Sequence, residues 1–155
     1  MFDLTEFNEM VKLAEKGDAF CQNMLGARLA TGYYLEKDQA GAFYWYCQAI
    51  KQGYTHAKWN GGSMILECEI KNISSFVGVR LVEEAARSFD NSACLFLSDC
   101  YRYGQYGKEV SIKQAEDWEK KAEQVNKLVE FSQPIDLVAE YSIIINKPML
   151  RPLNQ

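Results

Sequence analysis

The feature that most constrains this fold is a set of small side chains that recurs at intervals of 36 residues. The recurring positions pair Gly17 with Gly53, Cys21 with Ala57 and Ala93, Gly26 with Gly62 and Ser98, and Ala49 with Ala85. With one residue inserted in the third unit, Ala42 and Trp45 also match Ala115 and Trp118. A fixed period of this length is typical of chains built from stacked helical hairpins. Since small side chains let two helices approach closely, the pattern predicts three such units.

The predicted helices carry residues that can cap them. Asp18 and Asp38 precede the two helices of unit one, and Ser74 and Ser111 precede the second helices of units two and three. A side-chain oxygen at this position accepts a hydrogen bond from a free first-turn amide. Asp3 can open one further helix ahead of unit one. Caps at matching places predict an all-α chain.

Apolar residues of unit one follow a helical spacing. Cys21, Leu25 and Leu29 fall at i, i+4 and i+8 and form one stripe on a helix over about 19–30. Gly32 is expected to end this helix. The first helix of each unit therefore has an inward stripe that can face the second helix.

The whole chain, residues 1–155, is expected to form one domain. Terminal segments of repeat proteins commonly differ from the repeats because they cover the ends. The predicted parts are an N-terminal capping helix over 1–16, repeats over 17–52, 53–88 and 89–125, and a C-terminal capping helix and tail over 126–155. The last helix is expected to carry Ile135, Val138, Tyr141 and Ile145, with 151–155 frayed.

Unit one resembles the Sel-one-like repeat (SLR) family, which is related to the tetratricopeptide repeat. The residues that carry the resemblance are Ala14–Gly26, Gly32, Leu35, Asp38, Ala42, Trp45, Tyr46 and Ala49–Gly53. The match is close over unit one, partial over unit three and weak over unit two, and covers about residues 14–124. The resemblance implies an all-α, right-handed superhelical solenoid with a concave face. It also implies protein binding, as in adaptors, scaffolds and bacterial immunity proteins that neutralise toxins.

Composition narrows the classes of partner. The chain has 17 Lys and Arg against 21 Asp and Glu, a net charge of −4, so we expect no nucleic-acid partner. Its five cysteines and single histidine lack metal-ligand spacing, so neither a metal nor a cofactor is predicted. No apolar stretch is long enough for a membrane span, and no secretory signal opens the sequence. We therefore expect a cytoplasmic protein without a membrane partner.

Catalysis is the alternative to binding. A hydrolase that uses Cys or Ser would need a base, and His56 is the only histidine in the sequence. A capping or surface role is the simpler interpretation of His56, because no nucleophile motif accompanies it. The sequence therefore predicts a protein that is not an enzyme.

The outward positions of the first helices are the candidate binding surface. They are Asn23, Ala27 and Thr31 in unit one, Trp59, Ser63 and Glu67 in unit two, and Leu95, Asp99 and Tyr103 in unit three. His56 and Arg102 complete the candidate set of protein-binding residues. Trp and Tyr are enriched among binding hot spots, although Trp59 and Leu95 have the alternative of packing against a neighbouring repeat. Asp99 and Arg102 also have the alternative of pairing with each other.

The specific functional hypothesis is an immunity protein that binds and neutralises a cognate toxin or effector. A basic toxin would suit the acidic chain, since opposite charges speed association. A regulatory or scaffold adaptor is the alternative within the same family. The C-terminal helix around Ile143, Ile144 and Ile145 could also form a homodimer, or bury these residues by capping the solenoid.

Overall fold

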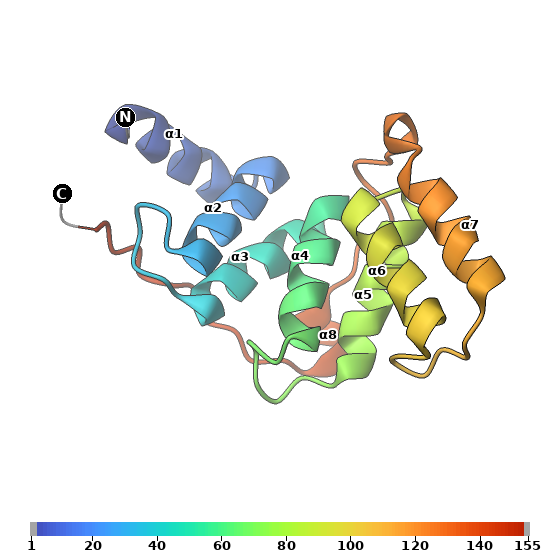
Figure 1. The fold of residues 1–155 in the computed structure, drawn as a ribbon. Helices are drawn as coiled ribbons and strands as arrows, with labels where there is room; N and C mark the ends of the chain where they lie inside the picture. Colours follow the sequence, from blue (N-terminus) through green and yellow to red (C-terminus); the bar gives the residue numbers. More distant parts are fainter. Residues whose placement is uncertain (1–2, 154–155) are drawn as a thin grey trace.

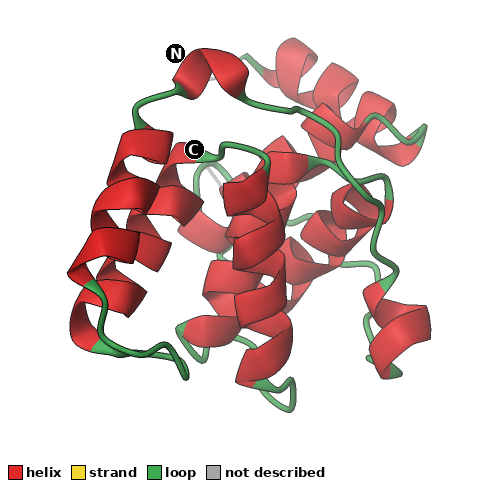
Figure 2. Cartoon of the chain, turned by 90° about the vertical axis from the view of Figure 1, so that its right-hand side faces the viewer, coloured by secondary structure: helices red, strands yellow, loops and turns green. Residues whose placement is uncertain are grey.

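The computed structural model describes residues 3–153 as a chain of helices and loops (Figure 2). The α-helices are α1 (Leu4–Glu15), α2 (Ala19–Thr31), α3 (Gln39–Lys51), α4 (Thr55–Leu66), α5 (Ser75–Arg87), α6 (Asn91–Tyr103), α7 (Ile112–Ala122) and α8 (Leu137–Tyr141). A 3₁₀ helix, η1 (Val125–Lys127), follows α7. Within the described range the strand-like pairings are isolated bridges, so the predicted all-α class is confirmed. No helix of that range is long and apolar enough to cross a bilayer.

Three helical hairpins form the body of the molecule. The pairs are α2 with α3, α4 with α5, and α6 with α7, and α1 packs against α2 (Figure 1). Successive hairpins contact each other through α3 and α4 and then through α5 and α6. The helical repeat predicted from the 36-residue period is therefore the observed architecture.

Small residues hold the two helices of a hairpin close together. A methyl group at Gly26 would lie 2.7 Å from a ring carbon of Tyr46, on the facing helix. At the equivalent Gly62 a methyl group would lie 3.0 Å from the carbonyl oxygen of Gly78. In the third repeat the same position is Ser98, whose hydroxyl donates to Glu119 of α7 at 3.1 Å. The recurring small residue is thus explained by the close helix contact.

The five predicted caps, Asp3, Asp18, Asp38, Ser74 and Ser111, are all present, and the start of α4 is satisfied in another way. Asp18 accepts from the amide of Cys21 at 2.7 Å, and the other α-helices except α4 also have an Asp or Ser cap. The residue before α4 is Tyr54, which makes no side-chain cap. The amide of Thr55 instead donates to the carbonyl of Glu130 at 2.9 Å. The C-terminal segment therefore supplies an acceptor for the start of α4.

The C-terminal segment corrects one prediction. Residues 128–153, here called the strap, do not form a capping helix on the last repeat. The strap runs back behind α4 and α5 toward the loop between α2 and α3 (Figure 1). Its hydrogen bonds join Val129 to Ser88 near its start and Leu153 to Tyr34 near its end. The expected fraying is also wrong for 151–153, and 154–155 lie outside the described residues.

The physical reasons for this difference lie in the surface of α7 and in the backbone of the strap at Ser142. The outer side of α7 is polar, with exposed Lys113, Glu116, Asp117 and Lys120, so the last repeat needs no apolar cover. In the strap, Ser142 has a left-handed backbone (φ 53°), which ends α8 after one short turn. The following residues alternate, with Ile143 and Ile145 packed on the core and Ile144 90% exposed. The isoleucines therefore lie on an extended segment, and not on the helix that the homodimer alternative required.

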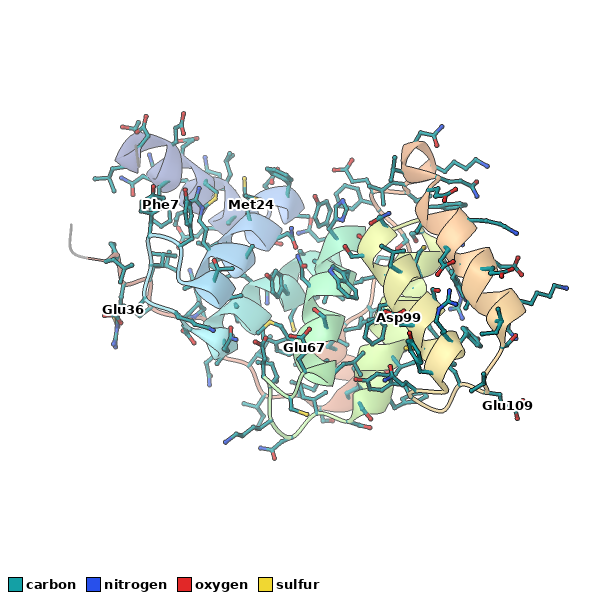
Figure 3. All side chains as sticks on the ribbon, viewed as in Figure 1. Phe7, Met24, Glu36, Glu67, Asp99 and Glu109 are labelled. Carbon is teal, nitrogen blue, oxygen red and sulfur yellow. The ribbon has the colours of Figure 1, made fainter. Side chains whose placement is uncertain are left out.

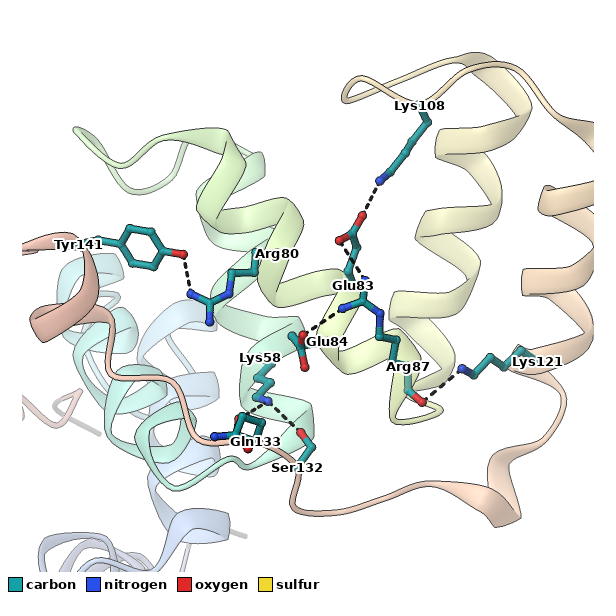
Figure 4. A network of polar contacts seen from close by, with 10 residues as sticks. All are labelled: Lys58, Arg80, Glu83, Glu84, Arg87, Lys108, Lys121, Ser132, Gln133 and Tyr141. Atoms are coloured by element: carbon teal, nitrogen blue, oxygen red, sulfur yellow. Dashed lines mark hydrogen bonds and ion pairs between the residues drawn. The ribbon is translucent and has the colours of Figure 1, made fainter.

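A buried lysine fastens the strap to α4. Lys58 is fully buried, and its amine donates to the hydroxyl of Ser132 at 2.8 Å and to the carbonyl of Gln133 at 2.6 Å (Figure 4). Burial lowers the pKa of this amine. A buried amine needs such partners, because an unpaired donor costs about 1–3 kcal/mol or more. Farther along, Arg80 of α5 donates to the hydroxyl of Tyr141 at 2.6 Å.

The contact between the strap and Gly53 generates a testable prediction. Gly17 and Gly53 occupy the same repeat position and both have a left-handed backbone, with φ of 101° and 86°. Alanine at Gly17 meets nothing within 4 Å, whereas alanine at Gly53 would lie 2.0 Å from the carbonyl oxygen of Ser132. Gly17→Ala should cost about 1–2 kcal/mol from backbone conformation alone. Gly53→Ala should cost about 1–3 kcal/mol more, because the strap must move.

Urea unfolding of the two variants measures this difference. Hydrogen exchange should also show faster exchange in the strap for Gly53→Ala and unchanged exchange there for Gly17→Ala. Equal destabilisation by the two substitutions would contradict the proposed role of Gly53 in seating the strap.

Candidate protein-binding face

Helices α2, α4 and α6 are the first helices of the three hairpins (Figure 1). Their outward side chains are here called the first-helix face. The predicted site residues fall into three groups by exposure. Exposed residues are Thr31, Glu67, Leu95, Asp99 and Tyr103. Half-buried residues are Ala27, His56, Trp59, Ser63 and Arg102, and the remaining residue, Asn23, is buried. Figure 3 shows Met24, Glu67 and Asp99 on the viewer's side of α2, α4 and α6.

Asn23 is a correction, because it does not lie on the open surface. Its side-chain oxygen accepts a hydrogen bond from the amide of Asn60 on α4 at 2.9 Å. The nearby Gln22 and Gln52 are also joined, at 2.8 Å. Asn23 therefore links the first two repeats, and a buried amide with a partner is a structural feature.

An aromatic cluster crosses the boundary between repeats two and three. The ring of Trp59 lies 5.9 Å from that of Phe96, which in turn lies 5.6 Å from that of Tyr106. Leu95 and Tyr103 flank this cluster on α6 and are 46% and 65% exposed. Trp59 thus packs against the neighbouring repeat and remains partly open to solvent. Sequence reasoning missed Phe96 and Tyr106, because neither occupies the outward i, i+4, i+8 series.

The polar residues of this face use different partners from those expected. Arg102 pairs with Glu119 of α7, not with Asp99, and Glu119 also accepts from Ser98. The guanidinium of Arg102 forms no ion pair with Asp99, and the side chain of Asp99 is exposed. Ser63 and Thr31 donate to carbonyls of their own helices. The expected alternative of an Asp99–Arg102 pair is therefore wrong.

His56 joins repeats two and three through Asp90. The ring nitrogen Nδ1 of His56 lies 2.6 Å from the carboxylate of Asp90, which also caps α6 by accepting from the amide of Ala93 at 3.0 Å. The hydrogen bond to Asp90 raises the pKa of His56, against the opposing effect of partial burial. Among the described residues, the hydrogen bonds of His56 include no serine or cysteine. This geometry gives a helix cap, and it does not assemble the nucleophile and base that a hydrolase needs.

Comparison with solved structures identifies the architecture. One neighbour is a protective antigen present in uropathogenic Escherichia coli strains that displays an SLR fold, with a TM-score of 0.68 and 19% identity. Another is a Sel1 repeat protein from Oxalobacter formigenes, with a TM-score of 0.68 and 18% identity. The chain has the SLR fold. The matches cover 76% and 79% of this chain but only 25% and 55% of those proteins.

Similarity in sequence is much weaker than similarity in fold. No protein-family model matches the sequence, and the search of curated proteins found no match. The SLR fold is therefore established by structure alone.

The SLR core also accounts for four of the five cysteines, all of which are free thiols. Burial raises the pKa of Cys47 to about 12 and the pKa values of Cys21, Cys94 and Cys100 to about 11. Within residues 3–153, which include every cysteine, Cys68 alone is exposed. No group of three metal-ligating side chains occurs in that same range.

The pairing of His56 with Asp90 predicts a pH-dependent stability. Because the pKa is raised in the folded state, the contribution of protonated His56 is complete below its unfolded pKa of about 6.5. It is lost as the pH rises through the folded-state pKa. The free energy of unfolding of wild type should therefore exceed that of His56→Gln by more at about pH 5.5 than at about pH 9.

The single histidine also permits a direct measurement. The NMR titration of the His56 ring should give a pKa above that of histidine in the unfolded chain. The Asp90→Asn substitution should lower the pKa of His56 in the folded protein. A folded-state pKa at or below the unfolded value would contradict the assigned pair.

The thiols provide a second prediction from this subsection. A thiol-reactive chromogenic reagent at neutral pH should modify one cysteine quickly, because the thiolate is the reactive form and four thiols are buried with raised pKa values. Cys68→Ser should abolish this fast reaction, and unfolding should expose the remaining thiols. A fast-reacting thiol that persists in Cys68→Ser would show that one of the buried cysteines is activated.

Proposed function

We propose that the chain is a non-catalytic module that binds another protein through its first-helix face. The observation that carries this proposal is the partly exposed cluster of Trp59, Phe96 and Tyr106 with Leu95 and Tyr103 beside it. Aromatic side chains supply large, rigid contact area and are enriched at the energetic centres of interfaces. Their exposed surfaces add nothing to the core, so an interaction explains them better than stability does.

The more specific proposal is that the partner is a toxin or effector that this protein neutralises in the cytoplasm. The support for it is the SLR resemblance together with the acidic net charge, which favours a basic partner. The free thiols fit a reducing compartment. A regulatory or scaffold adaptor is the alternative, and both use the same face. Immunity proteins are encoded beside their toxins, so the product of the gene next to this one is the toxin to test. Co-expression with that product separates the two roles, since an immunity protein should prevent it from arresting growth.

Paired substitutions test the binding face. A partner purified with the tagged full chain should bind Trp59→Ala and Tyr103→Ala at least about tenfold more weakly, the effect expected for residues near a hot spot. Phe76→Ala is the matched control, because Phe76 is 69% exposed but lies on α5. Isothermal titration calorimetry gives the affinities, and thermal unfolding checks that each variant is folded. A partner that tolerates both face substitutions and is lost with Phe76→Ala would overturn the proposal.

A further inference from the structure

The arginine and lysine side chains of the first helices all lie against other residues of this chain, and His56 of α4 pairs with Asp90. Helices α2, α4 and α6 carry three of them, Arg28, Lys58 and Arg102. The guanidinium of Arg28 lies over the rings of Phe7 and Tyr33, at 5.9 and 5.4 Å from their centroids, with its buried Nε and Nη1 lacking a hydrogen-bond partner among the described residues. Lys58 is buried against the strap, and Arg102 is paired with Glu119. None of these three cations forms an ion pair with Glu67 or Asp99, although the charge of Asp99 adds to the larger effect of Glu119 in raising the pKa of Arg102.

Two carboxylates on this face have no such partner. Glu67 ends α4 and Asp99 lies midway along α6, and both are exposed (Figure 3). Within residues 3–153, neither carboxylate forms an ion pair with a Lys, Arg or His nitrogen within 4.0 Å. The nearby Lys108 is paired with Glu83 of α5 (Figure 4). The exposed charges of the described first-helix face that lack an ion pair, Glu67 and Asp99, are therefore both negative.

Asp99 has aromatic and apolar neighbours on its own ridge. Leu95 precedes it by four residues and Tyr103 follows it by four, so all three side chains lie on one side of α6. A carboxylate next to an exposed aromatic ring suits a guanidinium or ammonium group, which gains charge attraction from the first and cation–π attraction from the second. The adjoining Trp59 and Phe96 offer apolar contact to the residues that flank such a cation.

We infer that the face of repeats two and three takes a segment of the partner that carries arginine or lysine beside apolar residues. This inference rests on the proposed function and adds the chemistry of the partner. The cation would lie between Asp99 and Tyr103, with Glu67 attracting further positive charge from α4. The apolar side chains of the segment would cover Leu95 and the aromatic cluster.

Peptide selection tests the inference without knowledge of the natural partner. The probe is a phage-displayed library of random peptides of about twelve residues, selected on the immobilised full chain. Enriched peptides should combine at least two Lys or Arg with aromatic or aliphatic residues. A synthetic copy of the best peptide should bind more weakly as the salt rises from about 50 to about 300 mM.

A matched pair of double variants locates the charge effect. Glu67→Lys with Asp99→Lys should weaken the peptide at least about tenfold. Glu116→Lys with Asp117→Lys changes the net charge equally on the exposed outer side of α7 and should alter affinity less than about twofold, since salt screens distant charges.

Each other outcome overturns the inference. Enriched peptides without net positive charge would overturn it, but the proposed binding face would stand if Tyr103→Ala weakened them. Equal losses in the two double variants would show a general charge effect instead of a local site. A selection that yields no peptide sensitive to Tyr103→Ala would remove the local site as well, and the partner titration above would then decide the proposed function separately.

Discussion

The close approach of the two helices within each repeat is the constraint on which the rest of this structure depends. Gly26 and Gly62 bring the first helix against the second, with no space for even a methyl group beside Tyr46 or the carbonyl of Gly78. This contact restrains how the first helix is rotated about its axis, because most other rotations would place a larger side chain at the contact. The rotation in turn determines which side chains point outward. The first-helix face is therefore a consequence of the small-residue repeat.

The strap is the second organising element. It is bonded to α4, which also carries part of the first-helix face. In the repeat frame Tyr54 replaces the capping Asp18 and Asp90 of the neighbouring units. The strap provides the missing acceptor to Thr55, and Lys58 on the next turn holds Ser132 and Gln133. These contacts join residues far apart in sequence, so they tie the repeats together in a way that nearest-neighbour stacking does not.

Local signals in the sequence predicted most of the helices, and non-local contacts explain the differences. Caps such as Asp18 and Ser111 act within four residues, so their effect is visible without tertiary structure. The strap depends on partners such as Gly53 and Lys58, about 75 residues away, and its apolar spacing fits a helix as well as an extended chain. The exposure of Asn23 was likewise mispredicted because its partner, Asn60, lies in the next repeat. The aromatic cluster was found in part, since Trp59 was identified but the rings that contact it were not.

The position of the face on fixed helices bears on how it can bind. Trp59 is held on α4, whose start is bonded to the strap and whose far side packs on α5, and Leu95, Asp99 and Tyr103 are held on α6. Asp90 and His56 join these two helices directly. Side chains whose backbone is already ordered lose less conformational entropy on binding, so more of the contact energy contributes to affinity. The strap and the His56–Asp90 pair can therefore influence binding without touching the partner, by keeping α4 and α6 at a constant separation.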